Sequence, residues 1–214
     1  MRVICNPGSG GGAWNPEGLR AELGDREFEW FLTRGPGDAR EAAREWRRGL
    51  LVVAGGDGTV NEAVQGLGSA GFPDGVTLAL LPTGTGNDLA RTLAVPTDPE
   101  EAVETMRAGR VRSLDAARVR SEEVGERFFV NVAVGGVGAK VSEAADDERL
   151  KDRWGRLTYS RAFFEVARGF DAPKLKLTVD GEERRIQAVN VAVGNCRYAG
   201  GGWPAAPRAN PEDG

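Results

Sequence analysis

The chain has 214 residues and a net charge of −4, which suits one large domain or two small ones and gives no overall attraction for nucleic acid. It contains no histidine, so Ser-His-Asp and Cys-His catalysis and histidine-ligated metal sites are excluded. There is no charged-then-apolar leader after Met1 and no apolar run long enough to span a bilayer. Cys5 and Cys196 lie far apart in apolar segments, as expected of reduced core residues.

The first half of the chain predicts repeated βα units. Apolar runs predict strands at residues 2–5, 28–33, 50–54 and 77–81, and the run at 50–54 is apolar throughout, as in a strand buried on both faces of a parallel sheet. Helices are expected between them: one capped by Asp38 and ended by Gly49, one with apolar spacing from Val60 to Leu67, and a helical turn at 86–93. Asp98-Pro99-Glu100-Glu101 is a strong helix start, and that helix ends near Gly109. The alternation predicts an open, doubly wound parallel sheet.

The pattern changes after Ser113, so we predict an α/β domain over residues 1–113 and a second domain over 114–214. Strands are predicted at 114–119 and 128–134, followed by a helical segment at about 140–169. Leu175, Leu177 and Val179 alternate with polar residues, which indicates a strand. Asp180-Gly181 predicts a hairpin turn, and residues 185–193 are predicted to form the returning strand. The second domain is therefore expected to be antiparallel with a helical insertion. The chain ends on a turn signal with no following strand, which predicts that return strands are missing.

Three glycine-rich loops follow predicted strands and precede predicted helices. They are Asn6-Pro7-Gly8-Ser9-Gly10, Gly55-Gly56-Asp57-Gly58-Thr59 and Pro82-Thr83-Gly84-Thr85-Gly86-Asn87-Asp88. Glycine lets the backbone approach a ligand closely, and a helix N-terminus presents free N–H groups that suit phosphate. Any one such loop marks a plain turn more often than a site, but three at the ends of parallel strands predict one polyphosphate site. The acids Asp57 and Asp88 would repel phosphate without a cation, which points to a nucleotide with Mg²⁺.

Together with Asn61-Glu62, these loops closely resemble those of the diacylglycerol kinase catalytic-domain family, which includes bacterial lipid kinases and the sphingosine and ceramide kinases. The resemblance runs from Arg2 to Gly214, with less specific matches at 131–138, around Trp154 and at Gly200-Gly201-Gly202. It implies an N-terminal domain like that of phosphofructokinases and NAD kinases and a C-terminal β-sandwich. It also implies an ATP-dependent kinase that phosphorylates a lipid hydroxyl, most simply that of diacylglycerol. No Gly-Lys-Ser/Thr follows the glycines, so this is not a Walker A fold.

Carried over residue by residue, the resemblance assigns specific roles. Asp57 helps to hold Mg²⁺, and Asp88 and Asp115 form an acidic catalytic network with it. The residues expected at the nucleotide phosphates are Asn6, Ser9, Gly55, Gly56, Gly58, Thr59, Thr83, Gly84, Thr85 and Asn87. Asp213 matches a family acid near a structural metal site. On the residues alone, Asp88 could equally be a helix cap and Asp115 a turn acid.

The sequence also departs from the family pattern. The family's proposed general base lies in an Asp-Gly-Glu segment beyond the position of Gly214. Asp180-Gly181-Glu182 looks similar but matches an earlier turn, so the base is not assigned to Asp180. This leaves two alternatives open: an NAD-kinase-type enzyme acting on a soluble substrate, and a nucleotide- or lipid-binding remnant without activity.

Residues 149–168 interleave arginine and lysine with aromatic side chains. Such a helix can lie on an anionic membrane, although an ordinary helix with a packed aromatic face and a solvated basic face is favoured. The expected partners are therefore ATP and a neutral lipid, with no nucleic acid. A homodimer is left open. The expected location is the cytoplasm, with peripheral contact at the inner membrane face also left open.

Overall fold

The computed structural model describes residues 1–10, 16–24, 28–122, 125–136 and 172–214. They divide into two compact units: one comprises 1–132 and 194–214, and the other comprises 133–193. In this division, residues 114–132 and 194–214 belong to the first unit, although the sequence places them in the second domain. The domain boundary at 113/114 stays a prediction.

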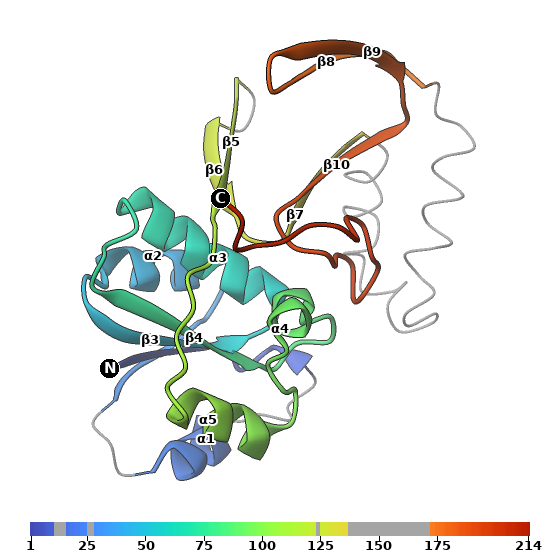
Figure 1. Cartoon of the computed structure of the whole chain (residues 1–214). Coiled ribbons are helices and arrows are strands. Elements are labelled where there is room, and N and C mark those ends of the chain that lie inside the picture. Colours follow the sequence, from blue (N-terminus) through green and yellow to red (C-terminus); the bar gives the residue numbers. More distant parts are fainter. Residues whose placement is uncertain (11–15, 25–27, 123–124, 137–171) are drawn as a thin grey trace. The chain divides into compact units, whose positions relative to one another are not determined.

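The first unit is built on a parallel sheet (Figure 1). Within the described residues its strands are β1 (Arg2–Cys5), β2 (Glu29–Leu32), β3 (Gly49–Gly55) and β4 (Val76–Pro82), in the order β2-β1-β3-β4. The register pairs Cys5 with Ala54 and Leu81 with Ala54, so the carboxyl ends of β1, β3 and β4 lie at one edge. The chain runs from β1 outward to β2, and from β3 outward to β4 on the other side. The loops after β1 and β3 therefore diverge at a topological switch point, where open α/β sheets bind their ligands.

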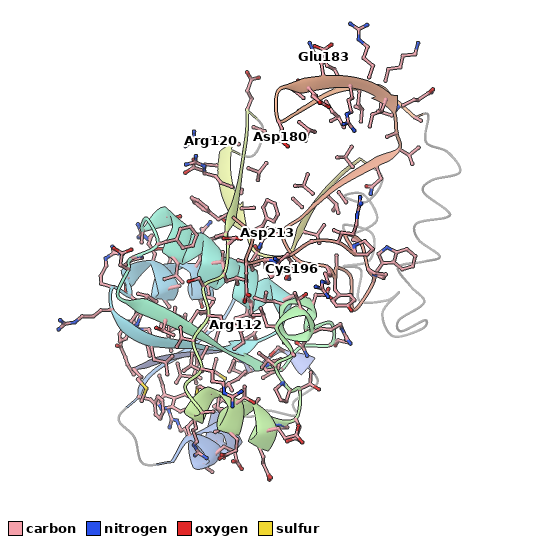
Figure 2. The ribbon with its side chains drawn as sticks, viewed as in Figure 1. Arg112, Arg120, Asp180, Glu183, Cys196 and Asp213 are labelled. Atoms are coloured by element: carbon pink, nitrogen blue, oxygen red, sulfur yellow. The ribbon has the colours of Figure 1, made fainter. Side chains whose placement is uncertain are left out.

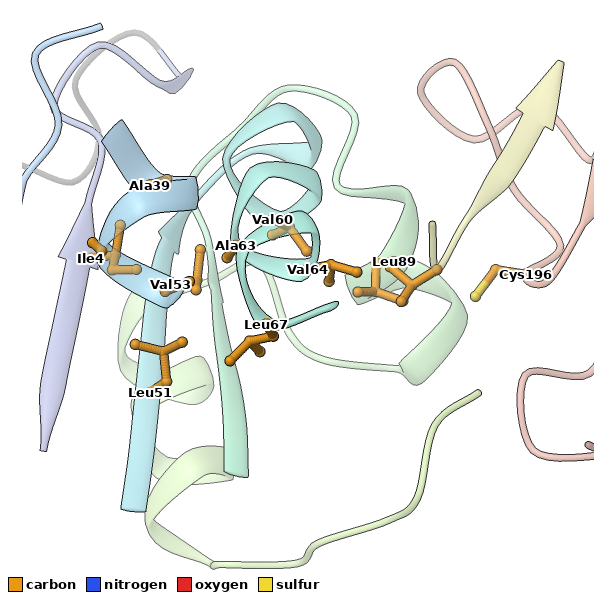
Figure 3. Packing of buried hydrophobic residues seen from close by; sticks show 13 residues of the cluster. Ile4, Ala39, Leu51, Val53, Val60, Ala63, Val64, Leu67, Leu89 and Cys196 are labelled. Atoms are coloured by element: carbon orange, nitrogen blue, oxygen red, sulfur yellow. The ribbon is translucent and has the colours of Figure 1, made fainter. Parts of the chain in front are cut away.

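Helices cover both faces of the sheet. They are α1 (Pro16–Leu23), α2 (Asp38–Glu45), α3 (Asp57–Ser69), α4 (Asp88–Leu93) and α5 (Pro99–Arg107). Ile4, Leu51 and Val53 point to the side of α2 and α3, where they pack with Ala39, Val60, Ala63 and Leu67 (Figure 3). Val3, Val52 and Ala54 alternate to the opposite face and pack with residues of α1 and α5. The doubly wound sheet predicted from the sequence is thus confirmed.

Antiparallel strands follow. In the first unit β5 (Ala117–Ser121) pairs with β6 (Gly125–Phe129). In the second, β7 (Val132–Gly136) pairs with β10 (Asn190–Gly194), and β8 (Lys174–Val179) forms an antiparallel hairpin with β9 (Glu182–Gln187). Asp180 and Gly181 at the hairpin turn have φ of 51° and 84°, the left-handed conformation that an Asp-Gly turn of this kind requires. The helical segment predicted at 140–169 lies outside the described residues.

Four local predictions are wrong. Gly37, with φ 93°, occupies the N-cap of α2, while Asp38 is its first residue and accepts a hydrogen bond from the Arg34 N–H at 2.8 Å. The same helix already ends at Glu45, and Gly49 opens β3. Residues 128–134 form parts of two strands, because the Asn131 carbonyl turns to accept the N–H groups of Asn195 and Cys196, each at 2.9 Å. Residues 185–193 likewise divide between β9 and β10.

Candidate active site

The loop after β1 (loop 1, residues 6–10) is joined to the two other glycine loops through side chains. Asn6 donates from Nδ2 to Thr59 Oγ1 at 3.0 Å, and its Oδ1 accepts the Gly8 N–H at 3.0 Å. Ser9 Oγ shares a hydrogen bond with Thr83 Oγ1. Gly10 has φ 66°, and a Cβ there would lie 1.6 Å from the Thr83 carbonyl oxygen, so no side chain fits. Loop 1 is therefore held against both neighbours.

The loop after β3 (loop 2, residues 55–59) leads into the N-terminus of α3. A Cβ on Gly55 would lie 2.5 Å from Thr59 Cβ, so the tight turn depends on its absence. Gly56 has φ −87°, so backbone approach and not positive φ explains this glycine: a Cβ on it would lie 3.0 Å from Gly84 Cα. Gly58 is exposed with open space beside it. Among the described residues no side chain caps α3 at Gly56, which leaves the first N–H groups of a 13-residue helix for an anion.

The loop after β4 (loop 3, residues 82–88) is locked by Asn87. Its side chain accepts the Gly84 N–H at 3.0 Å and donates to the Gly84 carbonyl at 2.6 Å, while its own φ is 52°. Thr85 is exposed between Gly84 and Gly86, and Thr83 is buried. All the residues predicted at the phosphates therefore lie on three loops at one edge of the sheet.

Two of the three predicted catalytic acids are brought together. Asp57 Oδ1 accepts the Asp88 N–H at 2.7 Å, so an acid of loop 2 caps α4. Burial, and secondly the charge of Asp88, raise the pKa of Asp57, while backbone N–H groups of Asp88, Leu89 and Asn87 lower it in part. A nearby cation would stabilise the ionised form of such an acid, whose charge is disfavoured by burial and by its acidic neighbour.

The Asp88 carboxylate, which is buried, holds a glycine loop from the C-terminal segment. Its two oxygens accept the N–H groups of Gly201 at 3.0 Å and Gly202 at 2.6 Å. This contact spans more than a hundred residues, and three adjacent glycines were the only sequence signal that could have pointed to it.

Asp115 lies in a different group of contacts, which includes residues on both sides of Asp213. Asp115 Oδ2 accepts the Gly214 N–H at 2.9 Å, and its N–H donates to the Pro211 carbonyl at 2.8 Å. Asn195 Nδ2 donates to the Asp115 carbonyl at 2.9 Å. The contacts described for Asp115 run to Asn195, Pro211 and Gly214 and not to Asp57 or Asp88. Figure 2 labels Asp213, which lies between Pro211 and Gly214 in the chain. The place of Asp115 in the acidic network stays a prediction, as does a metal at Asp213.

The donor set fits a magnesium ion that arrives with a nucleotide. Among the described residues no three acidic, histidine or cysteine side chains cluster as a complete metal cage. Mg²⁺ with a nucleotide needs only one or two carboxylates, since phosphate oxygens and water supply the remaining ligands. The Asp57 carboxylate, beside the α3 N-terminus, is the residue that would hold it.

The fold and these loops define a doubly wound α/β domain with a phosphate-binding edge at its topological switch point. Its family is shown by comparison: residues 1–119 match the diacylglycerol kinase catalytic domain, and residues 131–214 match the YegS C-terminal NAD kinase beta sandwich-like domain. The chain belongs to the diacylglycerol kinase catalytic-domain family.

Similar proteins carry related names. A diacylglycerol kinase of Staphylococcus saprophyticus is 32% identical over 220 residues, covering 100% of this chain and 70% of that protein. A probable lipid kinase YegS-like protein of Cronobacter sakazakii is 33% identical over 164 residues, covering 77% of this chain and 53% of its own length. The crystal structure of a diacylglycerol kinase from Bacillus anthracis superposes with a TM-score of 0.75 at 28% identity, over 100% of this chain and 70% of that one. These relatives support a lipid kinase.

The predicted cofactors, ATP and Mg²⁺, and the predicted lipid partner stay predictions. No helix within the described residues has the length and hydropathy needed to cross a bilayer. The basic aromatic segment at 149–168 lies outside the described residues.

Proposed function

We propose that this chain carries out ATP- and Mg²⁺-dependent transfer of the γ-phosphoryl group to the hydroxyl of a neutral lipid, most simply diacylglycerol. The observation that carries the proposal is the bonding of three glycine loops to one another at the switch point: Asn6 to Thr59, Ser9 to Thr83, and Asp57 to Asp88. The names of the relatives, diacylglycerol kinase and lipid kinase, support a lipid as the acceptor.

Phosphoryl transfer depends mainly on positioning and charge neutralisation, and the loops provide both. No side chain caps the start of α3 at Gly56, and a Cβ on Gly58 would meet nothing within 4 Å, so we expect phosphate oxygens to approach the backbone there. Asn6, Thr59 and Thr83 fix this geometry from three strands. When bound, Mg²⁺ would neutralise phosphate charge beside Asp57. Fixed dipoles of this kind need no reorganisation during the reaction.

The test is an assay with γ-labelled ATP and Mg²⁺ against diacylglycerol, sphingosine and ceramide in mixed micelles, with NAD as the soluble acceptor. We expect label in phosphatidic acid, and none in the Asp57→Ala or Gly58→Val variant. Label in NAD alone would assign an NAD-kinase-type activity instead. ATP binding without transfer to any acceptor would support a binding remnant.

A further inference from the structure

The segment 199–203, here called the Trp203 hairpin, combines a rigid backbone with an exposed aromatic side chain. Ala199 and Trp203 exchange two backbone hydrogen bonds, at 2.9 and 3.0 Å. Between them Gly200, Gly201 and Gly202 have φ of 63°, 83° and 100°, a left-handed run that only glycine adopts without strain. The hairpin is thus a bare backbone loop with an indole at its end.

Asp88 fixes this hairpin to the candidate active site. Both oxygens of the buried carboxylate accept N–H groups of the hairpin, and a Cβ on Gly86 of loop 3 would lie 3.4 Å from Gly201 Cα. Because Asp88 in turn donates to Asp57, the hairpin adjoins the phosphate-binding edge directly. Whatever contacts Trp203 is therefore held beside the reaction site.

The Trp203 side chain is 68% exposed, whereas Trp30 and Trp46 are half-buried against arginine side chains. An exposed indole leaves a large apolar area in water, and on a backbone already fixed by hydrogen bonds it gains contact area with little loss of conformational freedom. An indole is a rigid ring with an apolar body and a polar N–H, which suits the boundary between the apolar layer and the headgroups of a membrane.

Besides the buried Asp88 carboxylate, which holds the hairpin backbone, three arginines accompany the hairpin. The Arg91 guanidinium lies against Gly202, with Nε 3.3 Å from where a Cβ would be, and Arg197 and Arg208 flank the hairpin in sequence. In the part of the chain that the structure describes, none of these three arginines forms an ion pair, whereas the nearby Glu212 is paired with Arg112 at 3.3 Å. An exposed indole on a segment accompanied by arginines is a combination that suits the headgroup region of an anionic bilayer.

We propose that the Trp203 hairpin binds the membrane surface, with Trp203 inserted among the headgroups and the arginines attracting anionic lipid. This inference rests on the proposed lipid-kinase function, because it supplies the means by which a bilayer-resident substrate would be presented beside the glycine loops.

The test is co-sedimentation of the whole chain with vesicles of equimolar phosphatidylcholine and phosphatidylglycerol, without nucleotide. Trp203→Ala should weaken partitioning at least about tenfold, since an inserted indole removes a large apolar area from water. Trp203→Phe should fall between Ala and the native chain. Val111→Ala, at a side chain that is 70% exposed on the linker after α5, is the matched control and should bind like the native chain. Arg208→Gln should weaken partitioning about fivefold on these vesicles and leave partitioning onto pure phosphatidylcholine vesicles unchanged.

Tryptophan fluorescence provides the second measurement. The native chain should shift to shorter wavelength on vesicles and be quenched by brominated lipid, and Trp203→Ala should lose both signals while keeping its melting temperature. Equal vesicle binding by Trp203→Ala and the native chain would overturn the proposal. So would a Trp203-dependent change of oligomeric state, or quenching by ATP instead of lipid. The two proposals separate cleanly: vesicle binding through Trp203 with no phosphate transfer removes the kinase, and transfer in micelles with Trp203-independent vesicle binding removes the hairpin.

Discussion

Replacing Asp57 separates its two roles, as helix cap and as candidate cation ligand. Asp57→Ala removes the acceptor for the Asp88 N–H at 2.7 Å, and loss of such a cap costs about 1–2 kcal/mol. Relief of burial and of repulsion from Asp88, the two causes of its raised pKa, offsets part of that loss. We therefore expect about 1 kcal/mol of destabilisation, or about 2–4 °C in melting temperature for a chain of this size.

Asp57→Asn keeps an oxygen acceptor for the N–H but loses the charge. Its stability should stay close to that of the native chain, while its kinase rate should fall by several orders of magnitude, as in Asp57→Ala, because metal and positioning contributions are each worth several kcal/mol. Thermal unfolding and the labelled-ATP assay measure the two effects separately.

The matched control is Asp98→Ala. Asp98 caps α5 by accepting the Glu101 N–H at 3.1 Å, so this variant loses a cap and about 1 kcal/mol of stability. It should retain full activity. A fully active Asp57→Asn would refute the reasoning, because the carboxylate would then serve α4 alone.

Further predictions concern the loops and pH. Gly58→Val should abolish ATP binding with little change in unfolding, since a side chain there enters open space; unchanged ATP affinity by calorimetry would make loop 2 a mere turn. Gly10→Ala should destabilise the chain by clearly more than Gly24→Ala, which shares a positive φ but meets nothing within 4 Å, as chemical denaturation would reveal. Asp88→Asn should speed hydrogen exchange at residues 199–203, and unchanged protection there would show that the Asp88 carboxylate does not hold the hairpin in place. The pKa of Asp57 is raised in the folded chain, so the free energy of unfolding should fall as pH rises from about the ordinary value of 3.8 through the native pKa. Denaturant titrations across the acid range should show this decline in the native chain and not in Asp57→Asn.

The sequence predicts the elements whose signals are local. The apolar run at 50–54, the Asp98-Pro99 start and the Asp180-Gly181 turn each depend on residues that are neighbours in the chain, and each is found in the structure. At residue 38 the local rule misled, because Gly37 can adopt the left-handed N-cap conformation and so displaces Asp38 from that role.

Contacts between residues far apart in the chain could not be predicted from local sequence signals. The three loops are predicted to meet because parallel strands end at one edge, but the pairing of Asn6 with Thr59 or of Asp88 with Gly202 depends on packing between distant segments. The break at Asn131 has the same origin, since its carbonyl is claimed by residues 195 and 196. The catalytic role predicted for Asp115 comes from the family resemblance alone, and the contacts of Asp115 with Pro211 and Gly214 do not test it.

The cap that Asp57 provides for α4 also bears on the order of folding. A helix of six residues is too short to persist alone, and α4 draws its cap from a residue 31 positions earlier. Helix α4 therefore gains this cap only after β3 and the start of α3 have formed. Loop 3 and the hairpin that Asp88 holds would follow it, so the catalytic edge would be assembled last, on a sheet that is already in place.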